Sequence, residues 1–300
     1  MSLRARAADS FANLPPSIRL PLLHRLGRYA PWEAGFDFRP PTAGPGEAIG
    51  PPDFVGIGVQ KAGTTWWNDL INSHPAVYSR PDLHKERHFF DRFGAAPFRL
   101  SDIEDYHGWF PRTEGTVTGE WTPDYFSSPW VPPLLQRSAP DARVLLLLRD
   151  PVDRFLSGVA HHRRIEGASG PVVTADAMQR GFYHRALGDW SVHVPPSRLL
   201  VLQFERCVVD TAGQLRATFE FLGLPDHPPS PSMVGTASPV SARPGLDDDI
   251  RSRLVSIYES DVAALAAQHP GIDLALWPNF AYLAGGAVPG GEVNSPTRRP

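Results

Sequence analysis

The stretch Phe54–Trp67 (FVGIGVQKAGTTWW) combines an apolar run, a glycine loop and the beginning of an amphipathic segment. Phe54–Val59 predicts a buried strand, and Thr64–Asn72 predicts a helix whose tryptophan and aliphatic side chains face a core. The backbone N–H groups in the first turn of a helix are unpaired, so a helix that follows such a loop forms a ready site for an anion. Because Lys61 lies in the loop, the stretch predicts phosphate binding; the alternative is an ordinary turn from a strand to a helix.

Lysine is rare in this chain, which has 27 arginines but only two lysines, Lys61 and Lys85. A lysine inside the loop therefore indicates that the site needs a compact ammonium group rather than a guanidinium fork. The loop differs from the ATP-binding pattern G-x-x-x-x-G-K-[ST], in which the lysine follows the second glycine. Gly58 and Gly63 have the spacing of that pattern, but Lys61 precedes Gly63.

Composition limits the classes of protein that the chain can belong to. Its 300 residues, 42% of them apolar, are enough for one large α/β domain with a full core. No apolar run approaches the ~20 residues of a membrane span, and the N-terminus lacks an apolar signal segment, so we expect a cytoplasmic protein without membrane contact. A net charge of −3 argues against nucleic-acid binding. The single cysteine, Cys207, excludes an internal disulfide and a cysteine-cluster zinc site.

Three regions of the chain differ in composition. Residues 1–50 are rich in proline and show little periodicity, which predicts a wrapping N-terminal arm. Residues 51–284 predict the main domain. Residues 285–300, rich in Gly, Pro, Ser and Thr, predict a disordered tail.

Strands and helices alternate within the main domain. Aliphatic runs predict buried strands at Arg143–Leu148 and Leu199–Phe204. Periodic segments with capping residues predict helices at Thr211–Leu222 and Asp247–Gln268. This alternation implies an α/β fold, a parallel sheet with helices on both faces.

Four motifs, in the same order, resemble those of sulfotransferases that use 3′-phosphoadenylyl sulfate (PAPS), in particular their carbohydrate (heparan-sulfate type) branch. Lys61–Trp66 resembles the loop that holds the 5′-phosphosulfate, and Lys85–Asp91 (KERHFFD) the segment with the catalytic glutamate. Gly119–Phe126 (GEWTPDYF) resembles the Glu-Lys-(Ser/Thr)-Pro-x-Tyr segment, and Leu146–Ser157 the strand and helix that bind the 3′-phosphate. The resemblance spans residues 53–282. It implies a P-loop NTPase-like α/β fold, PAPS as donor and adenosine 3′,5′-bisphosphate (PAP) as product.

The resemblance also implies roles at the donor site. Lys61 would stabilise the bridging oxygen of the leaving phosphate. The residues that would hold the 5′-phosphate with it are Ala62, Gly63, Thr64 and Thr65. Trp66 would stack on the adenine; the alternative is packing against Trp67 in the core.

Three residues are candidates for the other end of the donor. Arg149 and Ser157 match the 3′-phosphate ligands of the family, although Arg149 could instead pair with Asp153. Arg243, in a region that matches poorly, could contact the 3′-phosphate or the adenine.

On the acceptor side, Glu86 is the candidate general base, and His88 could orient the acceptor or serve as the base itself. Glu120 and Tyr125 fit the family pattern and are expected to face the acceptor. Trp121 stands where the carbohydrate branch has a lysine, which indicates an acceptor less anionic than heparan sulfate.

The sequence thus predicts a bacterial-type enzyme that transfers a sulfuryl group from PAPS, directly and in line, to a hydroxyl of a sugar or natural product. We expect no metal at its site. Two alternatives stay open: a P-loop-type nucleotide-dependent kinase, which needs ATP and magnesium, and a non-catalytic nucleotide-binding module.

Overall fold

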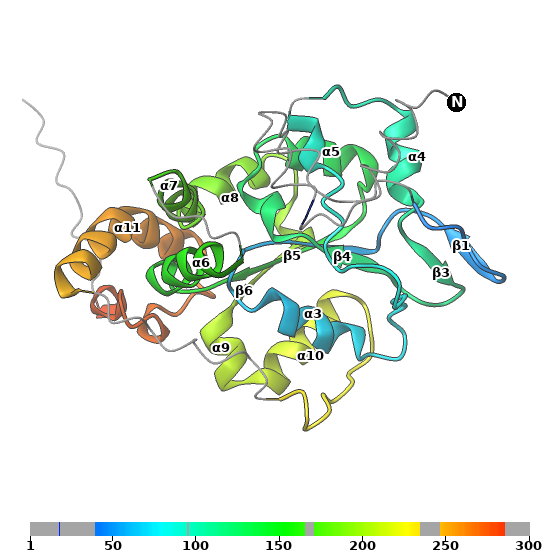
Figure 1. The fold of residues 1–300 in the computed structure, drawn as a ribbon. Helices are drawn as coiled ribbons and strands as arrows, with labels where there is room; N and C mark the ends of the chain where they lie inside the picture. The colour runs from blue at the N-terminus through cyan, green and yellow to red at the C-terminus, as the bar shows by residue number, and fades with distance from the viewer. Residues whose placement is uncertain (1–17, 19–39, 95, 166–170, 235–246, 286–300) are drawn as a thin grey trace, which may run out of the picture.

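A four-stranded parallel sheet with the order β4-β2-β5-β6 forms the centre of the protein (Figure 1). The computed structural model describes residues 18, 40–94, 96–165, 171–234 and 247–285. The strands of the sheet are β2 (Phe54–Gly58), β4 (Gly119–Trp121), β5 (Arg143–Leu148) and β6 (Leu199–Gln203). A separate two-stranded antiparallel sheet pairs β1 (Glu47–Ile49) with β3 (Pro111–Thr113).

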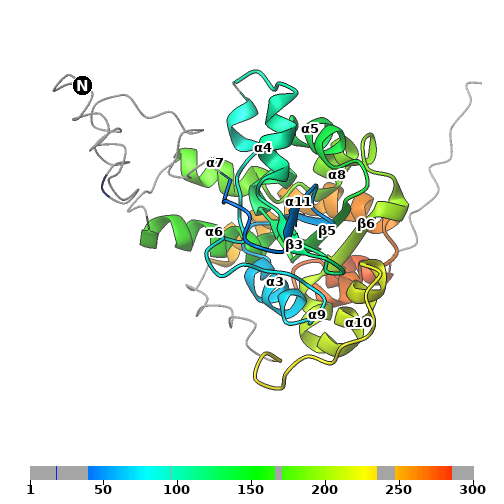
Figure 2. The same cartoon turned by 90° about the vertical axis from the view of Figure 1, so that its right-hand side faces the viewer.

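Helices cover both faces of the parallel sheet, as the sequence predicts for an α/β fold (Figures 1 and 2). One face carries α3 (Thr64–Asn72), α9 (Phe204–Val209) and α10 (Thr211–Phe221). The other carries α5 (Val131–Ser138) and α8 (Tyr183–Ser191). The remaining helices are α4 (Ser101–His107), α6 (Pro151–Ile165), α7 (Pro171–Gln179) and α11 (Asp248–Gln268). Short 3-10 turns occur at η2 (Asp91–Gly94), η3 (Pro123–Ser127), η4 (Pro196–Arg198), η5 (Leu274–Leu276) and η6 (Ala281–Gly285).

The two central strands are apolar because helices cover them on both sides. Every residue of β2 is buried, and so is β5 after its first residue. Gly56 of β2 lies opposite Trp121 of β4, and a Cβ atom at Gly56 would lie 2.0 Å from the Trp121 ring. Only glycine therefore lets this indole pack across the sheet.

The predicted element bounds agree with the structure to within about one residue. The strand predicted at Leu199–Phe204 ends at Gln203, because Phe204 already begins α9. β1, β3 and β4 were not predicted as strands, since each has only three residues. Of the N-terminal arm, only residues 18 and 40–50 are described, and the tail lies outside the described residues beyond Gly285. None of the described helices has the length and hydrophobicity needed to cross a membrane.

Parallel strands bring the segments that follow them to one edge of the sheet. The loop after β2, the turn after β4 and the residues after β5 and β6 all leave the carboxyl ends of their strands. In open α/β sheets this is the edge where ligands bind. The sequence motifs fall at this edge.

Candidate active site

The loop after β2 forms an anion cradle at the N-terminus of α3. Gly63 is the N-cap residue, with a φ of 86°, and within the described residues no side chain caps the helix. A Cβ atom at Gly63 would lie 2.6 Å from the ring of Phe204. Both the left-handed backbone and the contact with Phe204 thus require glycine, and the first-turn N–H groups stay available to an anion.

Lys61 occupies the tip of this loop in a left-handed conformation, with a φ of 70°. Such a conformation costs a non-glycine residue about 1–2 kcal/mol and is common at functional sites. Of the other predicted phosphate ligands, Ala62 and Thr64 are buried and Thr65 is exposed at the start of α3. The uncapped backbone N–H groups of the first turn and the exposed Thr65 side chain are therefore the groups best placed to meet a phosphate.

Arg149, at the end of β5, reaches the phosphate loop directly. Its Nη1 donates a 3.0 Å hydrogen bond to the carbonyl oxygen of Lys61. Its guanidinium lies 5.0 Å from the ring centroid of Phe204, a cation–π contact. Within the described residues Arg149 forms no ion pair with Asp153, which was the alternative prediction. Ser157, two turns into α6, is half-buried.

Trp66 packs inside the protein. It is 7% exposed, its ring centroid lies 5.2 Å from that of Trp67, and its Nε1 donates to the carbonyl oxygen of Met233 at 3.0 Å. The structure thus favours core packing, the alternative interpretation, over stacking on adenine. Arg243, the other predicted adenine or 3′-phosphate contact, lies outside the described residues.

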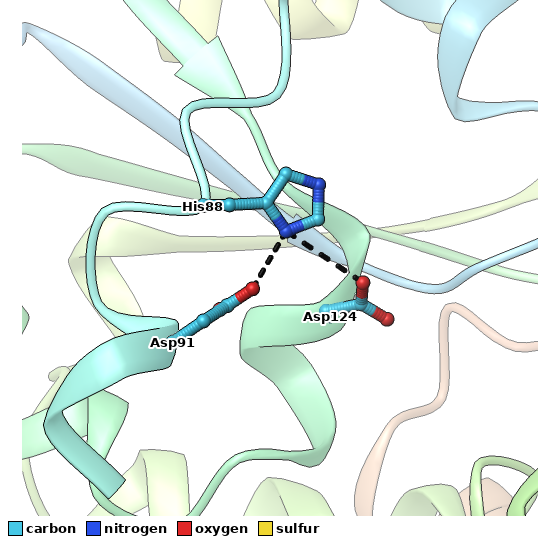
Figure 3. Close-up of side chains that lie close together, drawn as sticks. All are labelled: His88, Asp91 and Asp124. Atoms are coloured by element: carbon cyan, nitrogen blue, oxygen red, sulfur yellow. Dashed lines mark hydrogen bonds and ion pairs between the residues drawn. The ribbon is translucent and has the colours of Figure 1, made fainter. Parts of the chain in front are cut away.

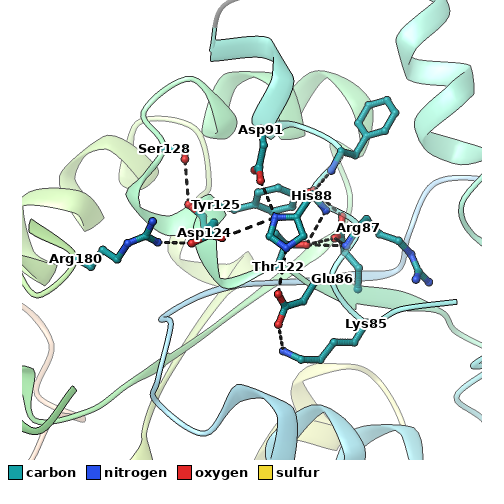
Figure 4. Close-up of polar contacts among 12 residues, drawn as sticks. Lys85, Glu86, Arg87, His88, Asp91, Thr122, Asp124, Tyr125, Ser128 and Arg180 are labelled. Atoms are coloured by element: carbon teal, nitrogen blue, oxygen red, sulfur yellow. Dashed lines mark hydrogen bonds and ion pairs between the residues drawn. The ribbon is translucent and has the colours of Figure 1, made fainter. Parts of the chain in front are cut away.

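The segment that follows Lys85 forms a chain of charged side chains (Figure 4). Glu86 Oε1 accepts from Lys85 Nζ at 2.8 Å, and Glu86 Oε2 lies 3.1 Å from His88 Nε2. The other ring nitrogen of His88, Nδ1, lies 2.6 Å from Asp91 Oδ2. Lys85 Nζ also lies 3.3 Å from Thr64 Oγ1. Lys85 therefore connects the predicted base to the phosphate loop.

These contacts shift the pKa values of Glu86 and His88 in opposite directions. Burial alone would raise the pKa of Glu86, but hydrogen bonds and charge from His88 and Lys85 outweigh it and lower the pKa to about 2. Burial alone would lower the pKa of His88, but hydrogen bonds and charge from Asp91 and Glu86 raise it to about 10. At neutral pH the pair is therefore a carboxylate beside an imidazolium.

A third carboxylate, Asp124, approaches His88 from the turn after β4 (Figure 3). Its Oδ2 lies 3.8 Å from His88 Nδ1, and its Oδ1 pairs with Arg180. His88, Asp91 and Asp124 offer atoms within 4.8 Å of one another, a spacing that could suit a cation. A protonated imidazole has no lone pair for a metal, however, and Arg180 already neutralises Asp124. We interpret the cluster as ion pairs that hold His88.

Glu120 lies behind this cluster and is 1% exposed. Its Oε1 accepts from the hydroxyls of Tyr106 at 2.8 Å and Tyr125 at 3.3 Å, and its Oε2 accepts from Thr122 at 2.6 Å and from the N–H of Arg87 at 3.2 Å. This network fixes the backbone that carries Glu86 and His88.

The structure corrects the prediction that Glu120, Trp121 and Tyr125 contact the acceptor. Trp121 and Tyr125 are fully buried, and Trp121 Nε1 donates to the carbonyl oxygen of Gly58 at 3.2 Å. Their side chains pack the sheet and the network behind the site, so they present no surface to an acceptor. The inference of a less anionic acceptor, which rested on Trp121, loses its basis.

A polar pocket of about 220 Å³ opens beside Lys85, between α3 and the segment that leads to Glu86. Its lining includes Asn68, Asn72, Arg80, His84 and Arg87. Arg87 is 8% exposed, its guanidinium lies 5.8 Å from the ring centroid of Phe110, and two of its nitrogen atoms have no hydrogen-bond partner among the described residues. Unpaired buried donors of this kind favour a polar or anionic group in the pocket.

Sequence reasoning missed several residues of the site. Asp91 ends the quoted KERHFFD motif, and its spacing of three residues from His88 could have revealed the pair. The motif gives Lys85 no role of its own, although it bonds to both Glu86 and the loop. Asp124 and Arg180 are 56 residues apart in sequence, so only the fold reveals their contact.

The geometry, with a phosphate cradle beside a poised carboxylate, defines a group-transfer enzyme of the α/β class. Comparison with known proteins gives the family. The model of the sulfotransferase domain matches residues 51–233, more than half of the chain. The chain belongs to the sulfotransferase family, whose members use PAPS as donor, and the match decides against the kinase alternative.

Two of the similar proteins are, by their names, heparan sulfate sulfotransferases, the branch that the motifs resemble. Heparan sulfate glucosamine 3-O-sulfotransferase 6 of Mus musculus is 33% identical over 199 residues, which cover 62% of this chain and 56% of that protein. Heparan sulfate glucosamine 3-O-sulfotransferase 3A1 of the same species is 32% identical over 188 residues, covering 58% of this chain and 46% of that protein. The matched part thus spans about half the length of these relatives.

A solved structure supports the fold. A sulfotransferase from Alicyclobacillus acidocaldarius superposes with a TM-score of 0.61 at 23% sequence identity. The match covers 76% of this chain and 99% of that one. This likeness concerns the arrangement of the sheet and its helices.

Proposed function

We propose that this protein transfers the sulfuryl group of PAPS to a hydroxyl group of a carbohydrate acceptor. The observation that carries the proposal is the double contact of Lys85, which bonds to Glu86 at 2.8 Å and lies 3.3 Å from Thr64 in the phosphate loop. One ammonium group thus joins the cradle for the donor to the carboxylate that would receive the acceptor's proton. Positioning of this kind supplies much of the rate in group transfer.

The residues present suit the donor. The 5′-phosphate fits the N-terminus of α3, where no described side chain caps the first-turn N–H groups that follow Gly63. Lys61 at the tip of the loop would neutralise the charge that develops on the leaving phosphate oxygen. Arg149, with Ser157, would take the 3′-phosphate, which guanidinium groups bind well.

In the transfer step, the acceptor oxygen forms a bond to sulfur while the bond from sulfur to the 5′-phosphate oxygen breaks. The bonding electrons stay on the phosphate oxygen, and PAP leaves. The hydroxyl proton passes to Glu86. Glu86 suits this role better than His88, because an imidazolium with a pKa of about 10 has no free lone pair at neutral pH. His88 instead holds the carboxylate in place and stabilises its charge.

The acceptor side favours a sugar. The pocket beside Lys85 is lined by amides and charged side chains, which match the hydroxyl and anionic groups of a glycan. The burial of Trp121 removes the aromatic surface on which the expectation of a less anionic acceptor rested. Both relatives named above act, by their names, on a glucosamine of heparan sulfate.

Two measurements test the proposal. In a thermal-shift assay, PAP should stabilise the protein more than ATP with magnesium does at equal concentration, because only a ligand of the native state raises the midpoint of unfolding. Mass spectrometry should then detect a gain of one sulfuryl group when glucosamine-containing oligosaccharides are incubated with PAPS. If PAP did not stabilise the protein, the proposal that PAPS is the donor would be contradicted. If PAP bound but no acceptor received a sulfuryl group, the protein would be a binding module and not a transferase.

A further inference from the structure

The segment around η5 and η6 closes the fold against the turn that follows Arg149. Asn279 donates twice to Asp150 Oδ2, from its backbone N–H at 3.1 Å and from its side-chain Nδ2 at 2.8 Å. The other oxygen of that carboxylate, Oδ1, accepts from the N–H of Val152 at 3.0 Å and so caps α6. Asp150 thus connects the C-terminal segment to the helix that carries Ser157.

The amide of Asn279 has a defined orientation. Arg251 of α11 donates from Nη1 to Asn279 Oδ1 at 2.8 Å. A guanidinium can only donate, so the amide oxygen must face Arg251 and the amide NH₂ must face Asp150. The contact with Asp150 is therefore set by the fold on both sides of the amide.

Two further links tie the same segment to the sheet. Trp277 donates from Nε1 to Glu205 Oε2 at 2.8 Å, and Glu205 Oε1 accepts from the N–H of Asp150 at 3.0 Å. Gln203, the last residue of β6, exchanges two hydrogen bonds of 2.9 Å with the backbone of Asp273. The backbone after β5 is thus held by the Glu205 side chain, which the C-terminal segment contacts in turn through Trp277.

These links hold Asp150 directly and, through it, the neighbouring Arg149. Its carbonyl oxygen accepts from the Tyr183 hydroxyl at 2.8 Å, and the next residue, Asp150, is fully buried with both carboxylate oxygens and its N–H bonded. Burial raises the pKa of Asp150, and burial raises the pKa of Glu205 to about 7. Burying two carboxylates costs free energy, which indicates that their positions matter to the molecule.

We infer that Asn279 is a positioning residue for Arg149, so that the segment 273–280, which lies beyond the part matched by the sulfotransferase family model, completes the site for the 3′-phosphate. The inference rests on the proposed function for its ligand. Asn279 does not touch the ligand itself. It fixes Asp150, and Asp150 fixes the backbone from which Arg149 extends toward the loop at Lys61.

The test compares two nucleotides that differ only in the 3′-phosphate. Isothermal titration calorimetry gives the Kd of PAP and of adenosine 5′-monophosphate for the full chain and for Asn279→Ala. The variant should bind PAP about tenfold more weakly, the effect of one hydrogen bond to a charged group, with little change for the monophosphate. A merely structural role would weaken both nucleotides alike.

A matched control lies in the same segment. Tyr282 of η6 donates from its hydroxyl to Glu259 Oε2 of α11 at 2.9 Å, a bond that also ties the segment to α11 but does not reach Asp150. Tyr282→Phe should leave the ratio of the two Kd values as in the wild type. If Tyr282→Phe lost as much of the preference for PAP over adenosine 5′-monophosphate as Asn279→Ala does, the effect would be a general loosening of the segment. That result would overturn the inference.

Exchanging the partners covers the case in which Asn279→Ala does not fold. Asn279→Asp sets two carboxylates face to face and should lower the preference for PAP further. Adding Asp150→Asn removes the repulsion, because the new amide can donate to the carboxylate at position 279, but the backbone N–H of that residue loses its acceptor; the double variant should therefore restore part of that preference. A double variant no better than the single one, or a folded Asn279→Ala with wild-type affinity for PAP, overturns the inference. A wild-type protein that does not bind PAP overturns the proposed function instead.

Discussion

Arg149 Nη1 donates a 3.0 Å hydrogen bond to the carbonyl oxygen of Lys61, 88 residues earlier in the chain. The bond joins the end of β5 to the loop after β2, two neighbouring strands of the sheet. It therefore connects the proposed 3′-phosphate site to the proposed 5′-phosphosulfate site. A nucleotide phosphorylated at both ends would therefore bind between two segments that are already joined by a hydrogen bond.

Replacing Arg149 should weaken the binding of the 3′-phosphate and largely spare that of the 5′-phosphate. Arg149→Ala should weaken the binding of PAP by ten- to a hundredfold, or about 1.5–3 kcal/mol, because it removes a charged hydrogen-bond donor to the 3′-phosphate. The affinity for adenosine 5′-monophosphate should fall much less, because the phosphate loop remains intact. Calorimetric Kd values for both nucleotides check this. Equal losses would mean that Arg149 acts only by holding the loop at Lys61.

Glycine at position 63 should be essential to the cradle. Gly63→Ala forces a side chain into a backbone with a φ of 86° and places its Cβ atom 2.6 Å from the ring of Phe204. We expect a loss of unfolding free energy of at least about 1 kcal/mol and a loss of PAP binding. Chemical denaturation and calorimetry measure the two effects.

Gly188 in α8 supplies the control for that substitution. A Cβ atom there would meet nothing within 4 Å. Gly188→Ala should therefore stabilise the protein by roughly 0.5–1 kcal/mol, the usual gain for a helix interior, and leave PAP binding unchanged. If both variants bound PAP normally, the loop would not be the phosphate site.

The local pattern of apolar residues in the sequence was enough to predict the main strands and helices of the fold. β5 runs from Arg143 to Leu148, as its aliphatic run indicates, and α3 begins and ends where the amphipathic segment does. β4 escaped prediction because three residues carry too little periodicity. Its place at the edge of the sheet depends on contacts with β2, which no local pattern encodes.

The site was predictable where one motif contains its parts, and less so where the fold joins them. Glu86 and His88, two residues apart, do contact each other. Trp121 stands at the position of a lysine in the family motif, but its indole fills the space above Gly56 and faces the core instead of an acceptor. The contact of Lys85 with Thr64 joins two motifs, and nothing in either motif alone indicates it.

Lys85 should set the pH range in which Glu86 is ionised. Glu86 must be a carboxylate to accept a proton, so activity falls as the pH drops through its pKa, which is about 2 in the presence of Lys85 and His88. Lys85→Ala removes one cation and should raise that pKa, which moves the acidic limb of the kcat/KM profile upward. Lys61→Ala, by contrast, should lower turnover without moving this limb. An acidic limb at the same pH in all three proteins would exclude Glu86 as the base.

The ion pairs of His88 should make stability depend on alkaline pH. The pKa of His88 is about 10 in the folded protein and ~6.5 in an unfolded chain. A raised pKa of a cationic group contributes stability that is complete below pH ~6.5 and is lost as the pH rises toward 10. The difference in unfolding free energy between wild type and His88→Gln should therefore shrink across this window, by about 4 kcal/mol. Asp91→Asn removes the partner 2.6 Å away and should narrow the window from its alkaline end. Urea denaturation at pH 6, 8 and 10 measures all three proteins, and a difference that stays constant with pH would show that His88 is neutral in the folded protein.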